Sequence, residues 1–289
     1  MKHFGLLTYS GTNNLGDEIQ SLAARRFLPR VDRYISREDL QCDPACDGAV
    51  STILNGWFLH HPERWPPHPA IRPLLTSFHV SQSKPSRWRP WKPGPAQIVM
   101  SPENIEYLRR HGPVGARDRA TLSLLSRHDV DSFYSGCLTL TLPAPKRIER
   151  KDIVACDLDA DLLRVFASRL RAPPLVTTHT DNVTRSEVDR FAKAESLLQL
   201  YAGARLVVTS RLHCALPCIA FRTPVLFIPR TSELDRQQPA LELAHHMSRE
   251  DFLTGRGRYD LEDPPPNPGL YTPLAEKLAA QCEAFVAEA

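Results

Sequence analysis

The segment 204–228, ARLVVTSRLHCALPCIAFRTPVLFI, decides the fold of this chain. Its apolar residues predict a buried strand over 206–209, a helix over 212–221 and a second buried strand over 225–228. This order of elements is typical of a parallel sheet that helices cover on both faces. Ligands of such sheets bind where the strands end. The turn after residue 209 is therefore the first candidate for a functional site.

The same alternation continues on both sides of this segment. The other strands predicted in the second half cover residues 153–156 and 175–178, and its other helices cover 161–170, 185–201 and 271–287. The strands predicted in the first half cover residues 4–9, 34–35, 50–54, 78–80, 98–100, 114–116, 132–134 and 138–142. The helices predicted there cover residues 17–27, 103–110 and 118–126. The pattern predicts an α/β protein.

A polar and basic stretch with prolines, residues 143–150, is the predicted domain linker. We expect one domain over residues 1–145 and a second over 146–289. Prolines crowd residues 60–96 and exclude long helices and central strands there. The loops of that region, which carry Trp65, Trp88 and Trp91, either line a binding face or form a packed irregular surface.

Composition places the chain among soluble globular proteins, with 42% hydrophobic and 24% charged residues. The net charge of +3 is spread along the chain without a basic stripe, which argues against nucleic acid as a partner. The apolar run at the N-terminus is too short for a signal peptide or a membrane span. We therefore expect a cytoplasmic protein with reduced thiols.

The spacing of the seven cysteines fits neither a usual zinc site nor a redox motif. Cys214 and Cys218 lie in an apolar helical run and are expected to be buried free thiols. Cys42 and Cys46 lie in a polar loop, where a metal is the less favoured alternative. For the acidic segment 157–161, helix capping is favoured over a divalent ion. No metal or cofactor is predicted.

Three residues after the predicted strand 206–209 carry the strongest functional signal. Ser210 is expected to cap the helix that follows, with Arg211 and His213 in its first turn. A helix start binds anions, and it lowers the pKa of a nearby histidine. His213 is therefore a candidate for proton transfer. The alternative is a core histidine that hydrogen-bonds to the backbone.

Three further segments are candidates, each with a structural alternative. In Gly-Ala-Arg-Asp, residues 115–118, Arg117 could bind an anion, or Asp118 could neutralise the nearby arginines. The opening loop 10–18 lacks the glycine pattern of a dinucleotide site, and its Asp17 is either a helix-start charge or a base. Asn55 and Trp57 suit the hydroxyls and apolar face of a sugar, but a buried core tryptophan explains the pattern equally well.

Together these segments resemble the polysaccharide pyruvyl transferase family. The resemblance rests on the sequences GTNNLGDEIQ at 11–20, NGWF at 55–58, GARD at 115–118, and SRLH followed by TPVLFI at 210–228. It implies two Rossmann-like domains that face a cleft, as in GT-B glycosyltransferases. It also implies phosphoenolpyruvate as the donor and two hydroxyls of a sugar or lipid-linked oligosaccharide as the acceptor. The product is a pyruvate ketal, and phosphate leaves.

The resemblance assigns the donor to the second domain and the acceptor to the first. The residues expected to bind phosphoenolpyruvate are Arg117, Ser210, Arg211, Leu212 and His213. The residues expected to bind the acceptor are Asn14, Asp17, Asn55 and Trp57. We expect His213 to be the acid, or the group that assists phosphate departure, and Asp17 to be the base. A lipid-linked acceptor implies peripheral association with the inner face of the membrane.

Two alternatives remain open at this stage. One is a glycosyltransferase of the same architecture with a nucleotide-sugar donor, which requires a carboxylate on the ribose, for example Glu233 or Asp235. The other is a carbohydrate-binding relative without turnover. Retention of Arg117, Arg211 and His213 argues against the second alternative.

Overall fold

The chain forms two compact units, each built around its own parallel sheet. The computed structural model describes residues 2–9, 11–45, 47–58, 61–81, 93–146, 149–183, 186–230 and 234–289. The first unit consists of the segments Met1–Thr12, Gln20–Leu138 and Glu276–Ala289. The second unit consists of the segments Asn13–Ile19 and Thr139–Ala275. The predicted α/β class is confirmed by both sheets.

This division differs from the predicted boundary after residue 145 in three segments, the first of which is 139–145, which belongs to the second unit. The segment Asn13–Ile19, which includes the first turn of helix α1 (Leu15–Arg25), belongs to the second unit, where the Leu15 amide donates a hydrogen bond to the His179 carbonyl oxygen at 2.8 Å. The C-terminal segment Glu276–Ala289 belongs to the first unit. Contacts between residues far apart in the chain decide these last two placements, and local sequence patterns do not reveal such contacts.

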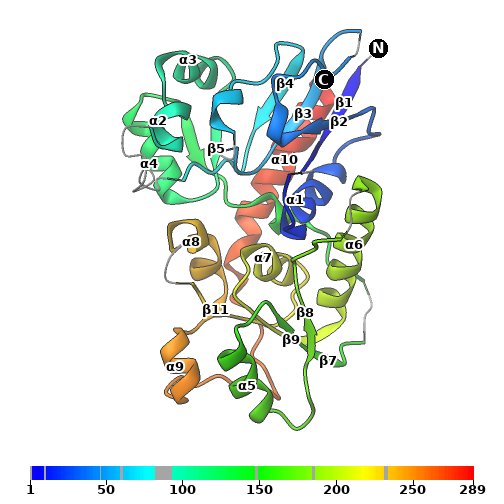
Figure 1. Ribbon diagram of the computed structural model, residues 1–289, viewed down its shortest axis with the longest axis vertical. Coiled ribbons are helices and arrows are strands. Elements are labelled where there is room, and N and C mark those ends of the chain that lie inside the picture. Colours follow the sequence, from blue (N-terminus) through cyan, green and yellow to red (C-terminus); the bar gives the residue numbers. More distant parts are fainter. Residues whose placement is uncertain are drawn as a thin grey trace. The chain divides into compact units, whose positions relative to one another are not determined.

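The second unit contains a five-stranded parallel sheet with the strand order β11-β10-β9-β7-β8. Figure 1 labels its strands β7, β8, β9 and β11. The strands of this unit are β7 (Asp152–Cys156), β8 (Leu175–Thr177), β9 (Ala204–Thr209), β10 (Val225–Phe227) and β11 (His245–His246). Its helices are α5 (Ala160–Ser168), α6 (Glu187–Gly203), α7 (Leu212–Ala220), α8 (Leu234–Leu243), α9 (Arg249–Thr254) and the 3-10 helix η5 (Gly269–Tyr271). The strands and helices predicted over 153–228 are thus confirmed.

Helices cover both faces of this sheet because successive strand residues point to opposite sides. On one face Leu206 and Leu226 share a hydrophobic cluster with Phe166 of α5 and Phe252 of α9. On the other face α6 and α7 pack against β9. The chain runs from β7 to β8 on one side and returns across β7 to form β9 on the other. The loops after β7 and β9 therefore diverge, and a crevice for ligands forms at such a point.

The first unit contains a four-stranded parallel sheet, β2-β1-β3-β4, and a two-stranded one, β5-β6. Its strands are β1 (His3–Thr8), β2 (Arg33–Ser36), β3 (Val50–Leu54), β4 (Ile71–Leu75), β5 (Val114–Ala116) and β6 (Ser132–Tyr134). The α-helices wholly or partly in it are α1 (Leu15–Arg25), α2 (Pro95–Val99), α3 (Pro102–Arg110), α4 (Arg119–Arg127) and α10 (Thr272–Glu288). Its short 3-10 helices are η1 (Arg37–Asp39) and η2 (Pro62–Arg64), and a third, η3 (Leu138–Thr141), lies where the first unit passes into the second. Among the described helices, none has the length and apolarity needed to cross a membrane.

The proline-rich region contributes to the core of the first unit. Trp65 packs against Phe58, Phe78 and Tyr107, with ring centroids 5.4, 5.5 and 5.6 Å away. It is therefore a core residue and does not line a binding face. Trp88 and Trp91 lie outside the described residues. The unpredicted strand β4 contains Pro73, which is tolerated because β4 is at the edge of its sheet.

Three predictions for the first half are wrong. Residues 98–100 do not form a strand, because Pro95 starts helix α2 and the Gln97 side chain accepts a hydrogen bond from the Gly94 amide at 2.8 Å. Residues 138–142 form the 3-10 helix η3 in place of a strand. Residues 78–80 form only single bridges to neighbouring segments. Short apolar runs do not distinguish strand from helix, which explains the first two errors.

Candidate functional site

The predicted anion-binding turn lies between β9 and α7. Arg211 takes the position before the helix with an extended backbone, and its side chain does not cap the helix. The predicted cap by Ser210 is wrong. The Thr209 hydroxyl fixes the turn instead, because it accepts a hydrogen bond from the Arg211 amide at 3.0 Å and donates one to the Cys156 carbonyl at 3.0 Å. The start of α7 is thus formed without a side-chain cap.

An ion pair joins the loops after β7 and β9 across the crevice. The Arg211 Nε donates to Asp157 Oδ2 at 2.7 Å, and Asp157 also accepts from the Thr178 hydroxyl at 2.5 Å and the His179 amide at 3.0 Å. Burial alone would raise the pKa of Asp157, but these hydrogen bonds and the Arg211 charge hold that pKa below its usual value. Asp157 is therefore ionised at neutral pH, and it offsets the charge of Arg211.

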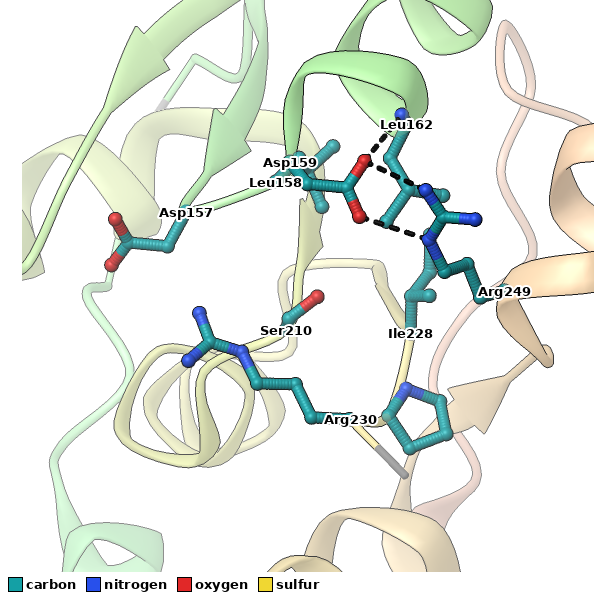
Figure 2. Close-up of a pocket in the computed structure, with 9 residues that line it drawn as sticks. Asp157, Leu158, Asp159, Leu162, Ser210, Ile228, Arg230 and Arg249 are labelled. Atoms are coloured by element: carbon teal, nitrogen blue, oxygen red, sulfur yellow. Dashed lines mark hydrogen bonds and ion pairs between the residues drawn. The ribbon is translucent and has the colours of Figure 1, made fainter. Parts of the chain in front are cut away.

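Two adjoining cavities open at this edge of the sheet and share Ser210 and Arg230. The larger has a volume of about 500 Å³ and is drawn in Figure 2. It is lined by Asp157, Leu158, Asp159, Leu162, Ser210, Ile228, Pro229, Arg230 and Arg249. The smaller has a volume of about 50 Å³ and is lined by Asn14, His179, Ser210, Arg211, Leu212, His213, Arg230, Arg236 and Gln237. Five predicted site residues, from two distant segments, thus meet in the smaller cavity.

Arg230 is a site residue that the sequence reasoning missed. It follows β10, and Gln237 of α8 holds its backbone by accepting from the Arg230 amide at 2.9 Å and donating to its carbonyl at 3.1 Å. In Figure 2 its guanidinium points toward the part of the cavity where Ser210 and Asp157 lie. It forms no ion pair with any described residue. Its position directly after a buried strand was the available signal.

Arg249, the other cation of the larger cavity, is neutralised. Its Nε donates to Asp159 Oδ2 at 3.0 Å, and this hydrogen bond lowers the pKa of Asp159. Asp159 also caps α5 by accepting from the amides of Asp161 at 3.1 Å and Leu162 at 3.0 Å. The predicted capping role of segment 157–161 is confirmed by this residue. Of the two cations that line the larger cavity, Arg249 is paired with a carboxylate, and Arg230 is paired with none among the described residues.

Gly16 allows the opening loop to approach the start of α7. A β-carbon at this position would lie 3.0 Å from His179 Nδ1, 3.1 Å from Asn14 Oδ1 and 3.2 Å from His213 Cβ. Any larger side chain would have to push these three residues apart. The glycine of the opening motif therefore brings Asn14 and two histidines around one point in the second unit.

The structure places the predicted acid at the cavity but not the predicted base. His213 lies in the first turn of α7, is 4% exposed and lines the smaller cavity. Asp17 lies in the first turn of α1, is 6% exposed and is not among the residues that line either cavity. Its roles as base and acceptor ligand stay predictions.

The other two predicted acceptor residues belong to the first unit. Asn55 is 1% exposed, and its side-chain nitrogen donates to the Gln20 carbonyl at 2.9 Å. Trp57 is partly buried against the hydrophobic core of this unit. Their positions support a structural contribution, and their contact with a sugar stays a prediction.

Arg117 also belongs to the first unit, at the start of α4. It is 1% exposed. The adjacent Asp118 caps α4 by accepting from the Thr121 amide at 2.8 Å, and it pairs with His79 Nδ1 at 2.5 Å. Burial would raise the pKa of Asp118, but His79, Arg117 and the cap lower it overall. The donor-binding role of Arg117 stays a prediction.

A buried polar cluster lies next to the smaller cavity. The thiols of Cys156 and Cys214 and a ring nitrogen of His179 lie within 4.8 Å of one another, a set that could hold a metal ion. However, the Tyr201 hydroxyl already contacts His179 Nε2 at 2.8 Å and Cys156 Sγ at 3.3 Å. Burial raises the pKa of the Cys214 thiol, whereas metal binding requires a thiolate. We interpret these residues as a hydrogen-bonded cluster.

The thiols of α7 agree with the sequence prediction. Cys214 and Cys218 are buried and free. The loop of Cys42 and Cys46 was considered as a less favoured metal site. In it Cys42 is exposed, and Cys46 lies outside the described residues. The cysteines of α7 therefore contribute to packing. Of the buried polar cluster around Tyr201, His179 is the residue that lines the smaller cavity.

Residues 105–232 match the model of a family described as polysaccharide pyruvyl transferase. Over these residues the chain is similar to the polysaccharide pyruvyl transferase family. The family inferred from the sequence motifs is thereby confirmed, and the match includes the turns at 115–118 and 210–213. No curated protein is similar enough to count as a relative.

Solved structures also resemble the chain. One is a protein described as uncharacterized, KP1_0663, from Klebsiella pneumoniae subsp. pneumoniae NTUH-K2044. It shares 12% sequence identity and superposes with a TM-score of 0.50, over 83% of this chain and 88% of that chain. At this identity the likeness shows the fold alone, an α/β protein with parallel sheets.

Proposed function

We propose that this protein is a pyruvyltransferase that moves the pyruvyl group of phosphoenolpyruvate onto two hydroxyls of a sugar. In this proposal the second unit binds the donor, and residues of the first unit contribute to binding of the acceptor. The observation that carries it is the smaller cavity. There Asn14 of the opening motif meets Ser210, Arg211 and His213 at the carboxyl edge of a parallel sheet. The family match over 105–232 supports the same reaction class.

The lining of the two cavities suits a donor with a phosphate and a carboxylate. Arg230 supplies a guanidinium that can grip an oxyanion with two hydrogen bonds, and no described carboxylate competes for it. Ser210 and the start of α7 supply further donors. We therefore assign the phosphate of the donor to Arg230 and Ser210. Arg211 is held by Asp157 and serves mainly to fix the two loops.

The reaction moves two protons, which leave the two sugar hydroxyls and end on the methylene carbon and on phosphate. A proton added to the methylene carbon of phosphoenolpyruvate develops positive charge at the adjacent carbon, which one sugar hydroxyl attacks. The second hydroxyl then displaces phosphate at the same carbon, and the two hydroxyl protons balance the one on the methyl group and the one on phosphate. His213, buried at the cavity, is the residue we assign to proton delivery.

The acceptor in this proposal is a sugar within a polysaccharide or a lipid-linked precursor. Asn14 is the predicted acceptor residue that lines a cavity. A lipid-linked acceptor would bring the protein to the inner face of the cytoplasmic membrane without a spanning helix. No metal or cofactor enters the proposed reaction.

A second candidate is a glycosyltransferase with a nucleotide-sugar donor. The larger cavity, at about 500 Å³, exceeds what phosphoenolpyruvate fills and has an apolar wall of Leu158, Leu162 and Ile228. Cavities of this size and lining hold nucleotide-sized ligands. Of the two carboxylates considered for the ribose, Glu233 lies outside the described residues, and Asp235 of α8 is not among the cavity residues. These observations make it the weaker candidate.

Turnover with defined acceptors tests the proposal. Purified protein is incubated with phosphoenolpyruvate and a panel of mono-, oligo- and lipid-linked saccharides, and phosphate release and product mass are measured. We expect phosphate release together with a product heavier by one pyruvate less one water. Parallel reactions use nucleotide sugars with the same acceptors. Transfer from a nucleotide sugar without any from phosphoenolpyruvate would establish the second candidate.

A further inference from the structure

His179 presents its two ring nitrogens to different surroundings. It follows β8, is 1% exposed and lines the smaller cavity, although no sequence motif pointed to it. Its Nε2 lies 2.8 Å from the Tyr201 hydroxyl, inside the protein. Its Nδ1 faces Gly16, where a β-carbon would lie only 3.0 Å from it. The Nδ1 is thus the nitrogen on the side of Asn14 and His213.

Tyr201 is suited to fix the proton of this imidazole. It is fully buried on α6, and burial raises the pKa of its hydroxyl well above the usual value, so the group stays a neutral donor. Its hydroxyl also contacts the Cys156 thiol at 3.3 Å and hydrogen-bonds with the Cys214 thiol. The hydrogen bond between Cys156 and Cys214, together with burial, raises the pKa of the Cys156 thiol, which therefore stays protonated.

The direction of the hydrogen bond follows from the quality of the acceptors. A neutral imidazole nitrogen accepts strongly, whereas a thiol sulfur accepts weakly. The Tyr201 hydroxyl therefore donates to His179 Nε2. A neutral imidazole that accepts at one nitrogen carries its hydrogen at the other. The hydrogen of His179 is consequently on Nδ1, where no described residue forms a hydrogen bond with it.

The backbone around His179 is held on both sides. Its amide donates to Asp157 Oδ2 at 3.0 Å, and its carbonyl accepts from the Leu15 amide at 2.8 Å. The ring orientation is then set by Tyr201. An immobile N–H group at a cavity that already contains Arg230 and the Ser210 hydroxyl adds one more donor to a site for oxyanions.

We propose that His179 is a ligand-binding residue whose Nδ1–H donates to an oxygen of the bound oxyanion, and that Tyr201 is the positioning residue that keeps this hydrogen on Nδ1. The inference rests on the proposed function only for the identity of the anion, phosphoenolpyruvate. In this role the imidazole stabilises negative charge on the donor without proton transfer.

Nitrogen-15 NMR of histidine side chains tests the tautomer directly. The full-length protein is labelled at histidine, and the His179 signals are identified by their loss in His179→Ala. We expect Nδ1 to carry the hydrogen and Nε2 to be unprotonated at neutral pH. The matched pair of variants is Tyr201→Phe and Tyr259→Phe, since Tyr259 is a partly buried tyrosine of the same unit that lines neither cavity. Only Tyr201→Phe should abolish the tautomer preference.

Titration with phosphoenolpyruvate, inorganic phosphate and a nucleoside diphosphate tests the contact. The Nδ1 signal should move on saturation with the bound anion. Tyr201→Phe should weaken anion binding between about two- and tenfold, with Tyr259→Phe unchanged. Hydrogen on Nε2, stoichiometric zinc bound at Nε2, or an Nδ1 signal that no anion moves would overturn the inference.

The two proposals fail in different ways. If the nucleoside diphosphate moves the Nδ1 signal and phosphoenolpyruvate does not, the role of His179 stands and the pyruvyl transfer proposal fails. If phosphoenolpyruvate is turned over while the His179 signal and the affinity of Tyr201→Phe are unchanged, pyruvyl transfer stands and the role of His179 fails.

Discussion

Two turns of this molecule connect a strand to a helix in the same way but differ in how the helix start is satisfied. In each, a parallel strand leads into a helix through an arginine: Arg211 between β9 and α7, and Arg117 between β5 and α4. At α4 the carboxylate of Asp118 caps the helix and also pairs with His79. At α7 no side chain caps the helix, and the turn opens on two cavities.

The difference shows what makes a helix start available to a ligand. At α4 the protein supplies its own anion, so the amides and the dipole are already satisfied. At α7 the carboxylate of Asp157 is paired with Arg211, and Arg230 remains without a carboxylate among the described residues. We therefore propose that catalysis takes place at the α7 turn and that the Asp118 cap of α4 stabilises the fold.

The largest expected effect is that of His213→Ala on turnover. Loss of a group that delivers protons lowers kcat by about 100- to 10,000-fold, while the KM for phosphoenolpyruvate changes much less. The measurement is phosphate release under saturating acceptor. A variant with near-normal kcat would remove His213 from the chemistry and leave the α7 turn as a binding site alone.

Asp118→Ala tests the other turn, the capped start of α4. It removes a helix cap and leaves His79 without its buried partner, so the free energy of unfolding should fall by about 3 to 5 kcal/mol. Asp159→Ala is the matched variant, because Asp159 caps α5 at an exposed site, and it should cost only about 1 kcal/mol. Denaturant unfolding followed by circular dichroism measures both. Equal losses would show that burial of the cap adds nothing.

Arg230→Ala tests the residue that the sequence motifs did not reveal. Because a hydrogen bond to a charged group contributes about 1.5 to 3 kcal/mol, the Kd for phosphoenolpyruvate should rise by about 10- to 150-fold. Arg258→Ala is the control, since Arg258 is an exposed arginine of the same unit that lines neither cavity. Calorimetric titration compares the two, and similar affinities would mean that the donor phosphate binds elsewhere.

The smallest expected effect concerns the ion pair of Asp157 with Arg211. Folding lowers the pKa of Asp157, so its carboxylate stabilises the folded protein above the pKa of an unfolded aspartate, about 3.9. That stability is lost as the pH falls through the lowered pKa of the folded state. Asp157→Asn should therefore lower Tm by about 2 °C at neutral pH, and its Tm should fall less steeply below pH 5. If the curves of Tm against pH run parallel for the unmodified protein and Asp157→Asn, the ion pair contributes no net stability.

The sequence predicted the second unit well because its signals are local. The apolar segment 204–228 alternates over lengths typical of strands and helices, and β9, α7 and β10 form there. In the first unit short apolar runs such as 98–100 were misread, since a proline at a helix start decided their structure. The assignment of the opening loop and of the last helix to units depended on distant contacts.

The candidate site shows the same limit. Ser210 and His213 were found because they sit at the end of a recognisable strand within a family motif. Arg230 and His179 also follow strands, but outside the quoted motifs. Nothing local marks which residue after a strand faces a cavity, or that Tyr201 would hold a histidine 22 positions away. Those facts depend on the order of strands in the sheet.

The most direct test of the account is ligand-induced thermal stabilisation of the unmodified protein. At about 100 times its Kd, phosphoenolpyruvate should stabilise the folded state by roughly 2.7 kcal/mol, which raises Tm by about 5 to 10 °C. Arg230→Ala should reduce that rise at the same concentration, and nucleotide sugars should give none. A rise in Tm with nucleotide sugars alone would contradict the account, since the cavity would then serve a different donor.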